Sequence, residues 1–114
     1  REELARAAHL HLARLALEIL LLFGPMRRFV LSRSRLIGTE HWSRASATGK
    51  GVLFLSSHVG NWEVMAATGA LHSPAETPMR LMLVTKHLKP EWFHRAIEKG
   101  RAACGVSATY EPHT

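Results

Sequence analysis

The sequence predicts an α/β fold in which N-terminal helices are followed by a β-α-β-α-β unit with a mostly parallel sheet. Leucines and alanines recur at helical spacing in residues 1–23. Further along, the apolar or β-branched runs 52–56, 80–85 and 105–110 are typical of strands, and helical segments separate them. Strands that alternate with helices usually pair in parallel, through right-handed crossovers.

The chain is predicted to divide into a helical region, residues 1–37, and an α/β region, residues 38–114. Its 114 residues suffice for one small domain, and a composition of 46% hydrophobic and 21% charged residues is that of a globular protein. The sequence begins at Arg1 rather than Met and stops shortly after the last predicted strand. We therefore expect the α/β region to be incomplete.

The first predicted helix, residues 1–23, changes character along its length. Its polar side offers two i,i+4 ion pairs, Glu2 with Arg6 and Arg14 with Glu18. Its last part, "LALEILLLF", is nearly apolar but shorter than the roughly 20 residues that span a bilayer. This part is either a buried core helix or a helix that lies in a membrane interface.

The second predicted helix, residues 26–36, is basic and amphipathic. "MRRFVLSRSRL" carries four arginines among apolar residues, directly after an apolar helix end. This combination is typical of a membrane-surface anchor, although both helices could simply pack on the rest of the fold. A formal net charge of +6 favours anionic partners in general, or only a solvated basic face. No zinc-finger, RNP-like or helix-turn-helix pattern supports nucleic acid. We expect an anionic membrane surface as partner, and no nucleic acid.

The middle of the chain passes from a short helix to a buried strand. Thr39 is a plausible N-cap for a helix through about Ala47, and Gly49 is a plausible terminator. Residues 52–56, "VLFLS", form a continuous apolar run, as in a strand that is buried on both faces. Asn61 can then cap the helix that follows.

The second half of the α/β region repeats this alternation. Pro90 suits the first turn of a helix over residues 90–103. This helix lies between the strands predicted over 80–85 and 105–110 and supplies their crossover.

His58 and Glu63 are the candidate reactive residues. In parallel α/β sheets, ligands bind beyond the carboxyl ends of strands, and His58 follows such an end. Glu63 lies five residues later in the first helical turn, where a folded-back loop would let its carboxylate orient the imidazole as a base. Gly60 lets the backbone of this loop approach a neighbouring group closely or adopt a positive φ. Spacing alone equally fits a histidine in a capping contact, with Trp62 as a packing anchor.

The remaining histidines and the cysteine indicate neither a metal site nor a disulfide. His9 and His11 point to different sides of a helix, and a predicted turn separates His87 from His94. Cys104 is the single cysteine, so it has no internal partner, and its place at a helix-to-strand joint predicts a packed residue. We expect no metal.

The stretch "GKGVLFLSSHVGNWEVM" resembles the bacterial lipid A biosynthesis acyltransferases. These are the late (lauroyl/myristoyl) acyltransferases of the wider lysophospholipid acyltransferase superfamily. Their signature is a His, four residues and an acidic residue, which in this branch typically reads His-x-Gly-Asn-Trp-Glu. His58, Gly60, Asn61, Trp62 and Glu63 all match. The resemblance runs from about residue 36 to residue 110 and identifies the chain as an N-terminal fragment of such an acyltransferase fold.

The resemblance implies a role for six residues. His58 is the general base, and Glu63 orients it. Gly60 and Asn61 belong to the same motif and are expected to bind substrate. The family usually has a basic residue after the next strand and an arginine near the end of the next helix. Lys86 and Arg101 occupy these two places and are likewise expected to bind substrate.

The resemblance also implies the reaction and its partners. The expected reaction moves an acyl chain from a thioester of acyl carrier protein or coenzyme A to a hydroxyl of a membrane glycolipid, in lipid A biosynthesis. No cofactor is needed. Residues 1–37 become membrane-associating helices at the cytoplasmic face of the bacterial inner membrane. The alternatives are another acceptor, such as a phosphatidylinositol mannoside or other glycolipid, and a non-catalytic membrane-binding α/β module.

Overall fold

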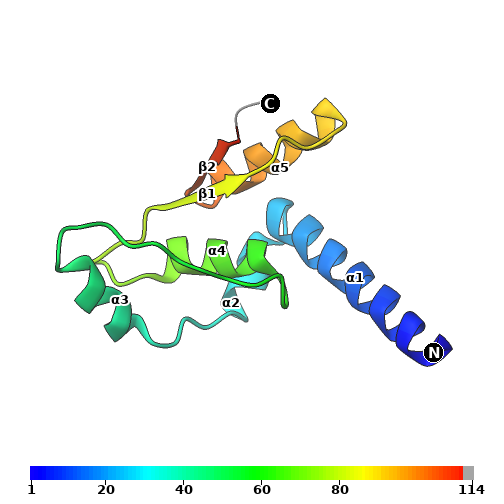
Figure 1. Ribbon diagram of the computed structural model, residues 1–114, viewed down its shortest axis with the longest axis horizontal. Helices are drawn as coiled ribbons and strands as arrows, with labels where there is room; N and C mark the ends of the chain where they lie inside the picture. Colours follow the sequence, from blue (N-terminus) through cyan, green and yellow to red (C-terminus); the bar gives the residue numbers. More distant parts are fainter. Residues whose placement is uncertain (112–114) are drawn as a thin grey trace.

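The computed structural model of the protein describes residues 1–111, so the last three residues of the predicted α/β region lie outside the described residues. An α/β fold is confirmed: helices and a small parallel sheet alternate along the chain (Figure 1). The elements are α1 (Glu2–Phe23), α2 (Arg27–Ser32), α3 (Thr39–Ser46), α4 (Trp62–His72), β1 (Leu81–Thr85), α5 (Glu91–Ala103) and β2 (Val106–Tyr110).

The sheet consists of β1 and β2, which pair in parallel. Leu81 lies opposite Val106, and Thr85 lies opposite Tyr110 at the carboxyl end. Helix α5 makes the crossover between them, and both α4 and α5 pack against the sheet. This β-α-β unit is the part of the prediction that the structure reproduces most closely, with boundaries within a residue of those expected.

The strand predicted over residues 52–56 does not form. This segment has no regular secondary structure, and the sheet of the described residues contains only β1 and β2. Leu53 and Leu55 are 84% and 92% exposed, while Phe54 stacks on Trp42 of α3 with ring centroids 5.6 Å apart. A strand is stabilised by hydrogen bonds to a neighbour, and this run passes α3 and α4 without reaching the edge of β1 (Figure 1).

Two of the predicted helix boundaries were wrong. Helix α2 ends at Ser32, short of residue 36, because the amides of Arg33 and Ser34 bond to carbonyls only three residues back, which tightens the last turn. Thr39 is the first residue of α3 rather than its cap. Gly38 stands at the cap position with φ +83°, a left-handed conformation that glycine adopts without steric strain.

Helix α1 projects from the rest of the molecule (Figure 1). Its first half is exposed, including Leu4 and Leu10, and only its last turns pack against α2, α4 and α5. Neither predicted ion pair of α1 forms among residues 1–111, and Glu18 contacts α4 instead. Over the same residues, no helix is long and apolar enough to cross a membrane.

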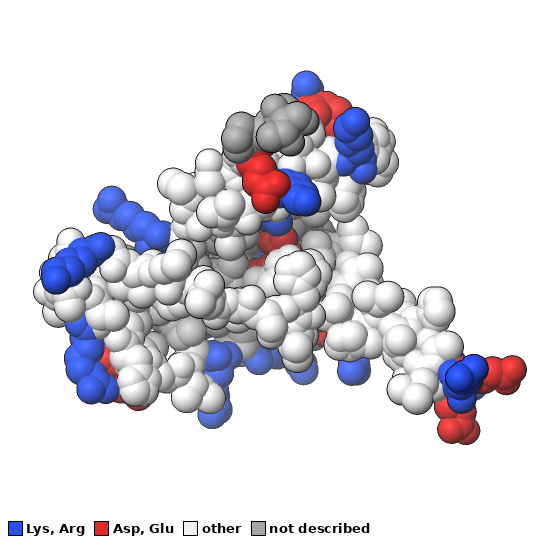
Figure 2. All heavy atoms as spheres, in the orientation of Figure 1, with Lys and Arg blue, Asp and Glu red and all other residues white. Residues whose placement is uncertain are grey.

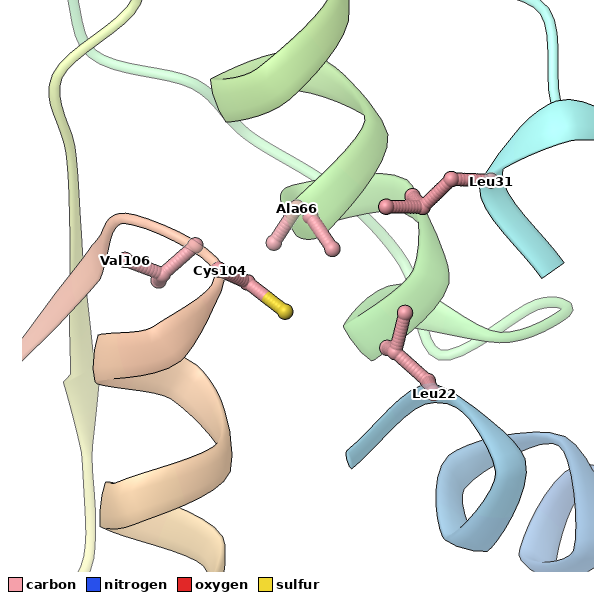
Figure 3. Close-up of a cluster of buried hydrophobic side chains, with 6 residues drawn as sticks. Leu22, Leu31, Ala66, Cys104 and Val106 are labelled. Carbon is pink, nitrogen blue, oxygen red and sulfur yellow. The ribbon is translucent and has the colours of Figure 1, made fainter. Parts of the chain in front are cut away.

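A small buried cluster joins the helices to the sheet (Figure 3). Leu22 of α1 and Leu31 of α2 face Ala66 of α4, and Val106 of β2 completes the cluster from the other side. Cys104, at the end of α5, points its sulfur into the same cluster and is fully buried. The prediction of a packed cysteine is thus confirmed, and its burial raises the pKa of the thiol.

Gly100 lets α1 approach α5. A β-carbon at this position would lie 2.3 Å from Cγ of Phe23, well inside van der Waals contact. The aromatic ring therefore rests directly on the α5 backbone, one residue before Arg101. This contact holds the end of α1 against the helix that carries a candidate site residue.

We predict that Gly100→Ala destabilises the chain. Overpacking against the ring opposes folding by about 1–3 kcal/mol, while the better helix propensity of alanine returns about 1 kcal/mol. Chemical denaturation should therefore show a net loss of up to about 2 kcal/mol. In a Phe23→Ala background, which removes the Cγ and both Cδ atoms that the new β-carbon would meet, the same substitution should be neutral or stabilising. An equal loss in both backgrounds would show that the ring contact is not the cause.

Candidate active site

His58 lies in the loop that leads into α4. Its imidazole is exposed and stacks on Trp62, with ring centroids 4.7 Å apart and an interplanar angle of 25°. Gly60, between them, has φ +76°, and no atom lies within 4 Å of the point where a β-carbon would be. A glycine is therefore favoured here by the backbone conformation and not by a lack of room for a side chain. Of the two reasons expected for a glycine here, the structure confirms the positive φ and shows no close approach. The turn at this glycine brings the histidine ring back over the first residue of the helix.

Asn61 caps α4, as predicted. Its Oδ1 accepts the N–H of Val64 at 3.2 Å, which satisfies one of the first-turn amides. Its Nδ2 donates to Oε2 of Glu18 at 3.0 Å and more weakly to the carbonyl of Leu15 at 3.4 Å. The side chain that sequence reasoning assigned to substrate thus bonds to α1 and α4.

Glu63 and Arg101 form a buried ion pair between α4 and α5. Arg101 donates from Nη2 to Oε1 at 2.5 Å and from Nε to Oε2 at 3.1 Å, which is a two-pronged contact. Glu63 is only 5% exposed, and Arg101 is also buried. The hydrogen bond to Glu63 raises the pKa of the Arg101 guanidinium, against the opposing effect of burial. The Arg101 guanidinium is therefore charged at every physiological pH.

The structure therefore brings together some predicted site residues and not others. Glu63 meets Arg101, and His58 meets Trp62, but within residues 1–111 no hydrogen bond joins His58 to Glu63. Lys86 is exposed directly after β1. A sequence contains no local signal for the Glu63 pair, because its partner stands 38 positions away. The substrate-binding roles of Lys86 and Arg101 stay predictions.

A second group of titratable side chains surrounds the carboxyl ends of β1 and β2. The rings of His87 and His94 lie 3.8 Å apart, and that of Tyr110 lies edge-on to His94 at 4.9 Å. Tyr110 donates to Oε1 of Glu98 at 2.5 Å, and His87 Nε2 lies 2.8 Å from Oε2 of Glu91. In the described part of the chain, no three such groups are arranged to hold a metal ion.

Comparison with known families decides what these residues belong to. The family described as bacterial lipid A biosynthesis acyltransferase matches residues 1–109. The chain belongs to this family. The match includes all six predicted site residues and both the helical and the α/β regions. No curated protein matches the chain, and no solved structure matches it either.

Family membership supports an enzyme that transfers acyl groups in lipid A biosynthesis. The family is associated with bacterial membranes. In this lipid A acyltransferase chain, the leucines in the first half of α1 and Arg28 of α2 are exposed, whereas Arg27 of α2 donates to the carbonyl of Ala103 at the end of α5.

We predict that Arg101→Met strongly destabilises the chain. It would leave the Glu63 carboxylate buried and unpaired, which typically costs about 3–5 kcal/mol. Urea denaturation of the chain measures the loss. The double variant Glu63→Leu with Arg101→Met should recover most of it, because an apolar pair of similar volume removes the unpaired charge. A double variant as unstable as Arg101→Met alone would contradict the assignment.

We predict that Tyr110 ionises late in the folded chain. Burial, and then the hydrogen bond to Glu98, raise the pKa of Tyr110 from 10.0 to about 12. Because the folded-state pKa is raised, the resulting stabilisation is complete below about pH 10 and is lost as the pH rises toward 12. Tyr110 is the only tyrosine, so absorbance at 295 nm follows it alone. Glu98→Gln should lower the midpoint, and a native midpoint near 10 would contradict the prediction.

Proposed function

We propose that the protein is an O-acyltransferase that moves an acyl chain from a thioester to a hydroxyl of a membrane glycolipid in lipid A biosynthesis. The observation that carries the proposal is the unbroken string His-x-Gly-Asn-Trp-Glu at residues 58–63, placed on an exposed loop that enters a helix. The His58 side chain is exposed to solvent, and Glu63, at the other end of the string, is buried.

In the proposed reaction, His58 takes the proton of the acceptor hydroxyl as that oxygen attacks the thioester carbonyl. A tetrahedral intermediate forms, with negative charge on the former carbonyl oxygen. Amide groups in the first turn of α4 are the proposed donors to this oxyanion. The carbon–sulfur bond then breaks, and the leaving sulfur takes the proton from the imidazolium. The products are an ester and a free thiol, and His58 returns to its neutral form.

The proposed role of Glu63 depends on Arg101. A carboxylate has about four lone-pair sites, so the two bonds to Arg101 leave capacity for one from an imidazole N–H. Arg101 holds the carboxylate in a fixed orientation at the start of α4. A rotation of the loop at Gly60 would let His58 leave its stack on Trp62 and donate to Glu63. The bond would set the tautomer of His58 and stabilise its charged form.

The proposed partners are anionic. Figure 2 shows lysine and arginine side chains along the edge of the molecule near α2 and α3, and others near α5. Lys86 would add a point charge beside the carboxyl end of β1, suited to a phosphate. A thioester of acyl carrier protein or coenzyme A and an anionic membrane surface both fit this distribution. We propose the cytoplasmic face of the inner membrane as the place of reaction.

One observation favours a second candidate function. Because Glu63 contacts Arg101 and not His58, the chain also fits a non-catalytic membrane-binding α/β module, in which the ion pair is purely structural. Acyl transfer to a phosphatidylinositol mannoside or other glycolipid keeps the same chemistry and differs only in the acceptor. Both acyltransferase hypotheses require His58 as the base, whereas the non-catalytic module does not, so substitution of His58 distinguishes them.

We predict that His58→Ala lowers acyl transfer by about 100- to 10,000-fold, the usual contribution of a general base. The assay follows a labelled acyl chain from its carrier-protein thioester into lipid A precursors, in membranes from bacteria that express the protein. His72→Ala is the matched control, since His72 is an exposed histidine at the far end of α4.

Membrane binding is measured in parallel. Both variants should bind phosphatidylglycerol vesicles as well as the unaltered protein does, because neither residue lies in the basic or apolar surface of α1 and α2. Transfer that survives His58→Ala would reject His58 as the base. Absence of transfer by the unaltered protein, with vesicle binding intact, would favour the non-catalytic module.

A further inference from the structure

The only charged residue in the apolar part of α1 is Glu18, in the run "LALEILLLF". Its side chain is half-buried, and burial of a carboxylate is unfavourable unless it is hydrogen-bonded. Arg14, one turn earlier, is not its partner: among residues 1–111, Glu18 forms no ion pair. Its Oε2 accepts instead from Nδ2 of Asn61, at 3.0 Å.

The amide hydrogens of Asn61 are not free to bind a substrate while they bond to α1. Its two amide hydrogens go to Glu18 and to the Leu15 carbonyl, and its oxygen accepts the N–H of Val64. An asparagine that only caps a helix needs its oxygen alone. The amide end is therefore an additional contact, and it joins α1 to α4 at the residue directly before Trp62.

The hydrogen bond between Glu18 and Asn61 lies where the loop of His58 joins α4. Asn61 follows Gly60, the turn of the His58 loop, and Trp62, the next residue, carries the imidazole stack. A negative charge on Glu18 near the start of α4 is also favourable, since that helix end carries partial positive charge. Glu18 thus restrains the point from which the His58 loop leaves the helix.

We propose that Glu18 is a positioning residue for acyl transfer: it holds the Asn61 amide, and through it the His58 loop, at a fixed place on α1. The inference rests on the proposed role of His58. It makes α1 part of the active-site scaffold, in addition to any contact that its exposed leucines make with a membrane. Glu18 itself does not touch the reacting atoms.

The test exchanges donor and acceptor across the contact. Asn61→Asp keeps a capping oxygen but sets two carboxylates face to face, so kcat should fall about tenfold or more, with KM nearly unchanged. Glu18→Gln keeps an acceptor and should lower kcat by less than about threefold. Combining the two places an amide donor on α1 opposite a carboxylate on α4. The double variant should regain most of the rate lost by Asn61→Asp.

A second readout does not depend on catalysis. Stacking on Trp62 should shift the His58 ring protons upfield in NMR spectra of the chain, relative to exposed His72. Asn61→Asp should reduce this shift, and the double variant should restore it. Glu3→Gln is the matched control, because Glu3 is exposed in the first turn of the same helix, and it should change neither the rate nor the shift.

The outcomes separate the two proposals. If the double variant recovers neither the rate nor the NMR shift that Asn61→Asp loses, the two substitutions act independently and the positioning role of Glu18 is wrong. If the NMR shift responds as expected but the unaltered protein transfers no acyl chain, the contact stands as a restraint on the loop and the proposed function is wrong. If recovery occurs in both readouts, Glu18 positions His58 for the reaction.

Discussion

The ion pair between Glu63 and Arg101 is the interaction on which the arrangement of α4 and α5 depends. The two charges are buried together, and each of the two carboxylate oxygens accepts one guanidinium N–H. A pair of this kind adds little net stability over an apolar pair, but separating its members is very unfavourable. Its effect is therefore on geometry: α5 can slide or rotate on α4 only by breaking two charge-assisted hydrogen bonds.

The ion pair and the Gly100 contact together connect three helices. Phe23 packs on Gly100, next to Arg101 in α5, and Arg101 holds Glu63 in α4. Helix α1 also contacts the start of α4 directly, through the hydrogen bond between Glu18 and Asn61. The three contacts link α1 to α5, α5 to α4 and α4 back to α1. These contacts fix Asn61 and Glu63, the two residues on either side of Trp62, where the exposed loop of His58 enters α4.

Local chemistry made much of this predictable from the sequence. The cap at Asn61 and the left-handed turn at Gly60 depend on residues within a few positions of one another, and the structure confirms both. The helix and strands of the β-α-β unit are also marked by local patterns, and the rule that strands joined by a helix pair in parallel supplies the contact between β1 and β2. Burial of Cys104 followed from its place at a helix-to-strand joint.

The contacts that sequence reasoning missed are long-range. Arg101 lies 38 positions from Glu63, and Glu18 lies 43 positions from Asn61, so no helical or strand period relates them. A single carboxylate inside an apolar run was the one available signal for Glu18. The strand predicted at residues 52–56 failed for a related reason. An apolar run shows that a segment favours burial, but pairing requires a neighbour whose position the run does not encode.

That unpaired run has a consequence for the handling of the protein. Residues 52–55 combine high β-propensity with no charge, and their leucines are exposed close to α3 and α4. Such a segment is a template for cross-β association between chains. Met82 and Val84 of β1 are also exposed and enlarge the apolar surface that is prone to aggregation. The opposing force is mutual repulsion from a net charge of +6, which salt screens over about 10 Å at 0.1 M. Colloidal stability of the isolated chain is therefore greatest at low ionic strength.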